Sequence, residues 1–229
     1  MTAAIEIKKE YSLAEFLEWV RQYGLDDQQY ELINGEIVER DPEREAGPSG
    51  RHGEVMNILG SELRYFAKAE KLARVFTDAA CTLSINVNLD LETAANEAAS
   101  SNISSITGKG KRRTKKANLT KASYVIPDVS LFLASTQLPT KFNGPIPALP
   151  ELVAEINSPT DTTERIHDKI EIYRKAGVRL IWSIFLLDEY VLAYRMGQPD
   201  KQYLGLDDEL DGGEVLPGFQ LRVRQLFDQ

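Results

Sequence analysis

The chain has 229 residues and a formal net charge of −8, with 42% apolar and 27% charged residues. These fractions exclude a disordered or membrane-bound chain, and the length suffices for a substantial hydrophobic core. No apolar run approaches the roughly 18 to 20 residues that a membrane span requires, and the first residues do not read as a secretion signal. We therefore expect a cytoplasmic protein with no membrane partner.

The single cysteine, Cys81, excludes an intramolecular disulfide and a multi-cysteine metal site, and it is most simply a buried core residue. The negative charge argues against a protein that coats nucleic acid nonspecifically, because such affinity comes mostly from neutralised phosphates. An enzyme that acts on nucleic acid stays open. Carboxylates clustered at a metal site add negative charge, which the bound cation offsets.

The N-terminal half predicts two helices, a hairpin and a strand. Ser12 and Glu15 form a capping box that opens the first helix. Asn34-Gly35 stands between two short alternating runs and is the strongest short hairpin signal. After a polar loop, apolar spacing predicts a second helix over about residues 52–70, and the alternating segment CTLSINVNL predicts a half-buried strand.

Residues 92–121 break this pattern, because they contain almost no large apolar side chains and end in the basic run GKGKRRTKK. Such a segment cannot bury enough surface to offset its ordering entropy, so we interpret it as a flexible insertion between two strands. For the basic run, a solvated loop is favoured over a contact with the DNA backbone.

From Tyr124 onward, strands alternate with a helix. VIPDVSLFLA and ELVAEINS predict strands, and a capping box of Asp161 and Glu164 opens a helix that ends at Gly177. RLIWSIFLLDEYVLAYRM predicts a hairpin that turns near Asp188, and LPGFQLRV predicts a small closing strand. With no internal repeat and no second core, residues 1–229 are expected to form one α/β domain.

Two acidic residues, Asp128 and Glu155, lie on otherwise apolar strands. Alternation puts Glu155 on one side of its strand together with Val153 and Asn157. A carboxylate in the middle of an apolar strand needs a cationic partner or a metal ion, because burying an unpaired charge is expensive. Taken alone, Asp128 after a proline is also compatible with a simple strand start.

Lys169 is the cation that can reach Glu155. Glu155 lies roughly 10 Å before the end of its strand, at about 3.3 Å per residue. Lys169 lies about seven residues into the next helix, which returns over the sheet by a similar distance of roughly 10 Å. The two residues could form a structural ion pair, but the convergence of Asp128, Glu155 and Lys169 favours a functional site.

These residues carry a resemblance. PDVSLF, ELVAEINSP, the pattern K-x-x-x-Y-x-x-x-G-V from Lys169, and a strand with Trp182 resemble the Uma2 family of endonucleases. SLAEFLEW, YELINGEIVE and HGEVMNIL resemble its N-terminal half, so the likeness covers most of the chain. That family belongs to the PD-(D/E)XK superfamily. The resemblance therefore implies a restriction-endonuclease-like core, a mixed β-sheet flanked by α-helices, with an N-terminal helix and hairpin.

The resemblance also implies a divalent metal ion, Mg²⁺ or Mn²⁺, held by Asp128, Glu155 and the carbonyl of Ile156. Such an ion lowers the pKa of a bound water and neutralises charge that develops on a phosphate. Lys169 would orient that water or stabilise the transition state.

This chain departs from the wider superfamily at one position and from the Uma2 pattern at two. In the wider superfamily the lysine stands two residues after the glutamate, where this chain has Asn157, so Lys169 must reach in from the helix, as the Uma2 pattern also implies. The acid expected four residues before the helical lysine falls at Arg165, with Glu164 beside it. The family's aspartate after the tryptophan strand falls at Phe185.

Four further residues are candidates to support the site: Glu31, His52, Asn157 and Glu164. Glu31 matches an early glutamate of the family and could hold metal or its ligands, but a cross-strand pair is equally open. For His52 a role at the helix start is favoured, since a lone histidine specifies little. Tyr173 and Trp182 are most simply core residues.

The function predicted from the sequence is metal-dependent hydrolysis of phosphodiester bonds in nucleic acid, with DNA favoured over RNA. The main alternative is a catalytically inactive nuclease-fold module that binds DNA or protein. A structural oligomer subunit, such as a homodimer, is a third class. Fold resemblance alone does not define the substrate.

Overall fold

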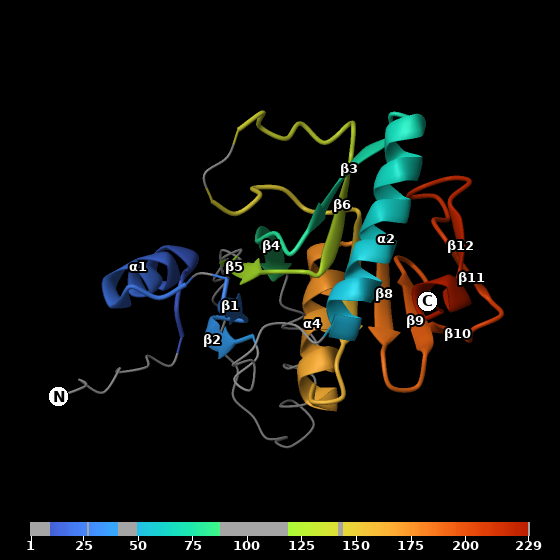
Figure 1. The fold of residues 1–229 in the computed structure, drawn as a ribbon. Coiled ribbons are helices and arrows are strands. Elements are labelled where there is room, and N and C mark those ends of the chain that lie inside the picture. The colour runs from blue at the N-terminus through green and yellow to red at the C-terminus, as the bar shows by residue number, and fades with distance from the viewer. Residues whose placement is uncertain (1–9, 27, 41–49, 88–118, 142–143, 229) are drawn as a thin grey trace, which may run out of the picture.

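Two main β-sheets organise the fold in the computed structural model, which describes residues 10–26, 28–40, 50–87, 119–141 and 144–228 (Figure 1). The elements in chain order are α1 (Leu13–Tyr23), β1 (Tyr30–Ile33), β2 (Glu36–Glu39), α2 (Gly50–Ala69), β3 (Ala73–Thr77), β4 (Cys81–Val87), β5 (Leu119–Val125), β6 (Val129–Leu133), β7 (Leu152–Asn157), α4 (Thr163–Ala176), β8 (Leu180–Phe185), β9 (Tyr190–Arg195), β10 (Gln202–Leu204), β11 (Glu209–Asp211), β12 (Gln220–Arg222) and the 3₁₀ helix η1 (Val223–Leu226).

The larger sheet is mixed and has the strand order β10-β9-β8-β7-β6-β3. Only β7 and β8 pair in parallel within it, and α4 is the crossover that connects them. The smaller sheet has the order β2-β1-β5-β4, and β11 and β12 form a separate pair. The structure therefore confirms a mixed β-sheet flanked by helices, with an N-terminal helix and hairpin.

Each helix covers a different part of these sheets. α2 packs on β3, β6 and β7 and closes one face of the larger sheet. α4 contacts β8 of the larger sheet and both β1 and β4 of the smaller one, so it connects the two sheets. α1 packs against β5 through Phe16, Trp19 and Val20. None of the helices among the described residues is long and apolar enough to cross a membrane.

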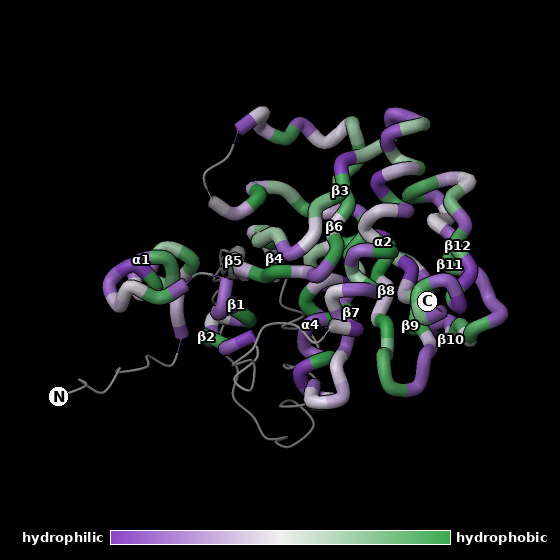
Figure 2. Tube along the Cα trace, in the orientation of Figure 1, coloured by the Kyte–Doolittle hydropathy of each residue, from purple (hydrophilic) through white to green (hydrophobic). Residues whose placement is uncertain are grey.

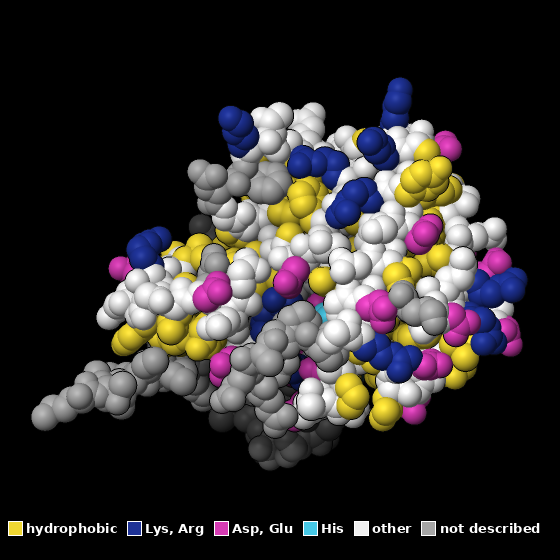
Figure 3. All heavy atoms as spheres, viewed as in Figure 1, with side chains coloured by type: hydrophobic (Ala, Val, Ile, Leu, Met, Phe, Trp, Pro, Cys, Tyr) yellow, Lys and Arg dark blue, Asp and Glu magenta, His cyan; other side chains and the backbone are white. Residues whose placement is uncertain are grey.

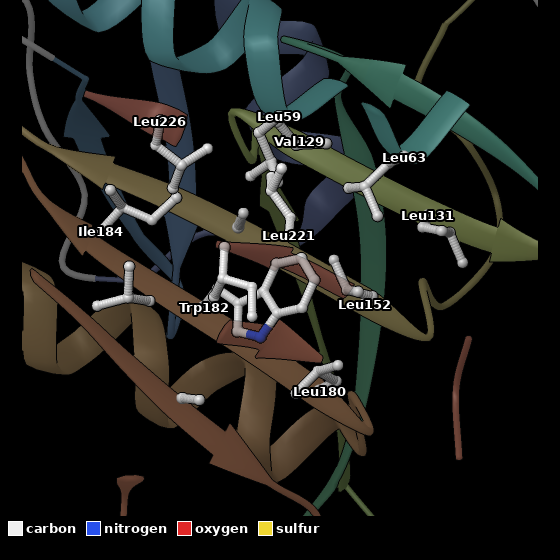
Figure 4. Packing of buried hydrophobic residues seen from close by; sticks show 14 of the residues in the cluster. Leu59, Leu63, Val129, Leu131, Leu152, Leu180, Trp182, Ile184, Leu221 and Leu226 are labelled. Atoms are coloured by element: carbon white, nitrogen blue, oxygen red, sulfur yellow. The ribbon is translucent and has the colours of Figure 1, made fainter. Parts of the chain in front are cut away.

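Trp182 on β8 is fully buried in the largest hydrophobic cluster. Figure 4 shows its indole ring among Leu152, Leu180 and Leu221. The ring also stacks on that of Phe219, with 6.0 Å between the ring centroids. In Figure 2 the central strands are largely hydrophobic, whereas hydrophilic and hydrophobic residues alternate along the helices. The interpretation of Trp182 as a core residue is confirmed.

Several local signals act as expected. Ser12 and Glu15 form the predicted capping box of α1. Asn34 and Gly35 both adopt positive φ, at 53° and 89°, which is the backbone of a type I′ turn. Gly177 ends α4 in the left-handed conformation with φ of 94°. These residues set the start, turn or end of their elements through short-range physics alone.

The segment VIPDVSLFLA was predicted to form one strand, and this prediction is wrong. β5 ends at Val125 and β6 begins at Val129, and the two strands belong to different sheets. Pro127 stands at the break, where it lacks the N–H that a continuous ladder would need. The break matters for function, because it places Asp128 at the crossing between the sheets.

Other differences concern the ends of elements. Thr162, not Asp161, caps α4, because its hydroxyl accepts from the Arg165 N–H, whereas Asp161 accepts from the Ser158 N–H. β5 begins at Leu119, inside the stretch 92–121 predicted as an insertion; residues 92–118 lie outside the described part. The strands β3, β10 and β11, which are five residues long or shorter, were not predicted.

Removing the Trp182 side chain should test this core. We expect Trp182→Ala to lower the free energy of unfolding by about 3–5 kcal/mol, because a large cavity would open among leucines that cannot collapse into it. Urea unfolding followed by circular dichroism measures the change. Tyr65→Ala on the exposed face of α2 is the control and should stay within about 0.5 kcal/mol of wild type. A loss below about 1 kcal/mol in Trp182→Ala would contradict the packing.

Candidate active site

Asp128 is held between the two sheets with both carboxylate oxygens engaged. Its Oδ2 accepts a hydrogen bond of 2.7 Å from the Ile156 N–H on β7. Its Oδ1 lies 3.4 Å from His52 Nε2 and 3.8 Å from Arg40 Nη2. Burial opposes ionisation of Asp128, but the hydrogen bond and charge of His52, together with Lys169, hold its pKa below the ordinary value.

Glu155 lies in the middle of β7 and is 7% exposed. Its Oε2 is 2.8 Å from Lys169 Nζ, and its Oε1 accepts a hydrogen bond of 2.5 Å from the Tyr173 hydroxyl. Burial raises the pKa of Glu155 to about 7; the charge of Lys169 opposes this rise, and the nearby carboxylates add to it. Tyr173 is a core residue, as expected, and in addition it is a hydrogen-bond partner of Glu155.

Lys169 projects from the buried face of α4, as the strand and helix arithmetic predicted. Its Nζ lies 2.8 Å from Glu155 Oε2 and 3.2 Å from Glu31 Oε1. Burial would lower the pKa of Lys169, but the two carboxylates outweigh burial and raise it. The side chain is therefore a cation fixed between two acids from different sheets.

Glu31 is fully buried on β1 and joins this cluster. Its Oε1 accepts from the Ile126 N–H at 2.7 Å, whereas its Oε2 has no hydrogen-bond partner among the described residues. The partner of Glu31 across the hairpin is Val38, so the alternative of a cross-strand ion pair on the hairpin is wrong. A buried carboxylate oxygen without a partner is costly and needs an explanation.

Arg40 is a residue of this site that sequence reasoning missed. Its side chain is 10% exposed and forms an ion pair of 2.9 Å with Asp78 beside its longer contact with Asp128. It also donates to the carbonyl of Ile126. Arg40 follows the N-terminal hairpin directly, and no local pattern marks it, because its partners lie far away along the chain.

The other predicted residues differ in their positions. His52 lies in the first turn of α2, as expected, but it is also buried against Asp128. Asn157 is buried and donates to Ser183 Oγ and the Ile184 carbonyl, so it connects β7 to β8. Glu164 is exposed at the start of α4 and does not join the cluster. Phe185 ends β8 and stacks on Tyr190.

The donor set fits a hard divalent cation in its chemistry. Three buried carboxylates, Asp128, Glu155 and Glu31, face two permanent cations, Lys169 and Arg40, and Arg40 is shared with Asp78. Oxygen ligands and this deficit of positive charge suit Mg²⁺ or Mn²⁺, and Glu31 Oε2 is available. Among the described residues, however, no three His, Cys, Asp or Glu side chains are already arranged to hold an ion. Glu155 would have to release Lys169 or Tyr173 to become a ligand.

The arrangement of sheets and helices has a counterpart among solved structures. It is similar to a crystal structure from Anabaena variabilis ATCC 29413, described as "a putative nuclease", with a TM-score of 0.64 and 21% sequence identity. That match covers 94% of this chain and 97% of the other. A comparison with curated proteins gives no match.

The family follows from a second comparison. The model of the Uma2 family, described as "Putative restriction endonuclease", matches residues 102–224, which is more than half of the 229 residues. The chain therefore belongs to the Uma2 family, as its motifs predicted. Asp128, Glu155 and Lys169 all lie within the matched stretch. Restriction-endonuclease-like families generally use divalent metal ions.

Replacing Lys169 should change how the stability of the protein depends on pH, because Glu155 loses its cationic partner. In Lys169→Met, Glu155 loses its cation, so its pKa in the folded state should rise further above that of the unfolded chain. An acid with a raised folded pKa loses stability as pH rises toward that pKa, because the unfolded chain ionises first. Lys169→Met should therefore lower the free energy of unfolding more at pH 8 than at pH 5. At pH 5 folded Glu155 is protonated in both proteins.

Urea unfolding in the presence of a chelator measures this difference without bound metal. Near pH 8 we expect Lys169→Met to lower the free energy of unfolding by about 3–5 kcal/mol, the usual scale for leaving a buried charge without its partner. Glu155→Gln with Lys169→Met should remove most of the pH dependence. A loss that is equal at both pH values would show that Lys169 acts through packing alone.

Proposed function

We propose that this chain is a nuclease that hydrolyses phosphodiester bonds of DNA with a divalent metal ion, Mg²⁺ or Mn²⁺. The observation that carries the proposal is Lys169, which is buried between Glu155 and Glu31 and stands near Asp128. Membership of the Uma2 family supports the nuclease class.

In this proposal Asp128, Glu155, Glu31 and the carbonyl of Ile156 supply the oxygen ligands. A metal ion bound there would lower the pKa of a bound water and neutralise charge on the phosphate. Asp128 is suited to the role because its lowered pKa keeps it ionised. The Ile156 N–H and His52 orient its carboxylate through the contacts described above.

Lys169 would act as an electrostatic stabiliser and not as a general base. Its raised pKa keeps the amine protonated near neutral pH, so it cannot accept a proton from water. A fixed cation in a site of low polarity instead stabilises negative charge that develops on the phosphate. Tyr173 and Glu31 limit the positions that Glu155 and Lys169 can take.

A non-cleaving module of the same fold is the second candidate, and one observation favours it. Both oxygens of Glu155 are already occupied by Lys169 and Tyr173, so no ligand set is preassembled among the described residues. In such a module the cluster would be a structural ion-pair network. The homodimer and the cytoplasmic location stay predictions from the sequence.

Metal binding and cleavage should depend together on the carboxylates. Wild-type protein should nick supercoiled plasmid DNA with Mg²⁺ or Mn²⁺, and chelation should stop it. Asp128→Ala should abolish both cleavage and the heat of Mn²⁺ binding in calorimetry, because it removes a ligand charge. Glu164→Ala, in the exposed first turn of α4, is the matched control and should keep both. Cleavage without added metal by a chelator-treated sample would contradict the mechanism.

Lys169→Met should separate binding from chemistry. Mn²⁺ should still bind, and more tightly, because a competing cation has left Glu155. The single-turnover rate should nevertheless fall at least roughly a hundredfold, the scale of losing one transition-state stabiliser. Full activity in a folded Lys169→Met protein would instead assign the lysine to structure alone.

A further inference from the structure

Three aromatic rings form a stacked row across three neighbouring strands of the larger sheet, β8, β9 and β10. Phe185 on β8 and Tyr190 on β9 stack with 4.5 Å between ring centroids and 10° between ring planes. Tyr190 and Tyr203 on β10 continue the stack with a spacing of 5.1 Å and an angle of 24°. The row therefore crosses three neighbouring strands and ends at Tyr203, which is 62% exposed.

The row starts beside the candidate active site and on the same face of the sheet. Asn157 pairs with Phe185, and Phe185 pairs with Tyr190. Asn157 stands two residues after Glu155, so both side chains project to the same side of β7. At about 3.3 Å per residue and about 4.8 Å between strands, the first ring lies within roughly 10 Å of Glu155 and the others lie farther out.

The same end of the sheet is joined to α2 by an ion pair. Arg51, which precedes His52, contacts Glu189 in the turn between β8 and β9. Figure 1 shows this turn and the first turn of α2 at the same end of the molecule. The ion pair therefore connects the start of α2, where His52 contacts Asp128, to the turn that directly precedes Tyr190.

Charge near the row favours contact with bases over contact with phosphates. Burial raises the pKa of Tyr190, and the negative charge of Asp188, two residues earlier, raises it further. Such a charge repels phosphate, whereas stacking depends on the flat apolar faces that every nucleobase offers. Tyr203 is the exposed end of the stack, and a base could stack on its free side, away from Glu155.

We propose that Phe185, Tyr190 and Tyr203 form a stacking platform for unpaired nucleobases of the substrate strand, on one side of the cleaved bond. This inference rests on the proposed nuclease function. It assigns the substrate class as nucleic acid with a single-stranded stretch next to the site of cleavage, because paired bases do not expose their faces.

Binding without cleavage tests the platform. Fluorescence anisotropy in chelator would compare a labelled oligodeoxyuridylate with an abasic deoxyribose strand of equal length. We expect the wild type to bind the oligodeoxyuridylate at least about fivefold more tightly than the abasic strand, the lower scale of stacking one base on an aromatic ring.

Variants locate the contact on the row. Tyr203→Ala should remove most of the difference between base-bearing and abasic strands, and Tyr203→Trp should keep it. Tyr65→Ala, which removes a tyrosine that is 79% exposed on α2, should change nothing. Equal binding of abasic and base-bearing strands by the wild type would overturn the platform. So would a Tyr203→Ala protein that keeps base-dependent binding.

Further outcomes separate this inference from its alternatives. If Tyr203→Ala changed only the molar mass in light scattering, the row would be a contact between copies of the chain, and the platform would be overturned. Asp128→Ala should keep base-dependent binding, because the platform lies outside the carboxylate cluster. In the wild-type protein, absent cleavage with retained base-dependent binding would overturn the nuclease function alone, and cleavage without base-dependent binding would overturn the platform alone.

Discussion

The ion pair between Glu155 and Lys169 is the constraint on which the rest of the structure depends. A carboxylate inside an apolar strand is tolerated only with a cation close by, and Lys169 provides it at 2.8 Å. The same amine contacts Glu31 on the other sheet. One buried cation therefore connects α4 to both sheets through ion pairs.

Asp128 shows how chain topology builds this centre. The chain leaves the smaller sheet at Val125 and enters the larger one at Val129, and Pro127 prevents one continuous strand. The backbone at this crossing is held by the Asp78 N–H, which donates to the Asp128 carbonyl at 3.0 Å. The Asp128 side chain is then held by a backbone N–H of β7 in the larger sheet and lies 3.8 Å from Arg40, which follows β2 of the smaller sheet.

Apart from the break at Pro127 and the cap of α4, sequence reasoning succeeded where the decisive physics was short-range or periodic. Asn34-Gly35 defines its turn by itself, and Lys169 could be matched to Glu155 because strand and helix have fixed rises per residue. It failed where position depends on distant partners. Arg40 carries no local signal of its contact with Asp128, 88 positions farther along the chain. Asp161 and Thr162 compete as caps, and only the local backbone decides between them.

The contacts that stabilise the candidate site are also the ones that catalysis would have to change. Glu155 is held by Lys169 and Tyr173, so it becomes a metal ligand only when one of these contacts loosens. An ion that took up part of the carboxylate charge would weaken the hold of Glu155 and Glu31 on Lys169. The lysine could then direct its charge toward a phosphate. In the proposed mechanism the ion pairs would hold the acids in place until metal and substrate bind, and the ligand set would not be preassembled among the described residues.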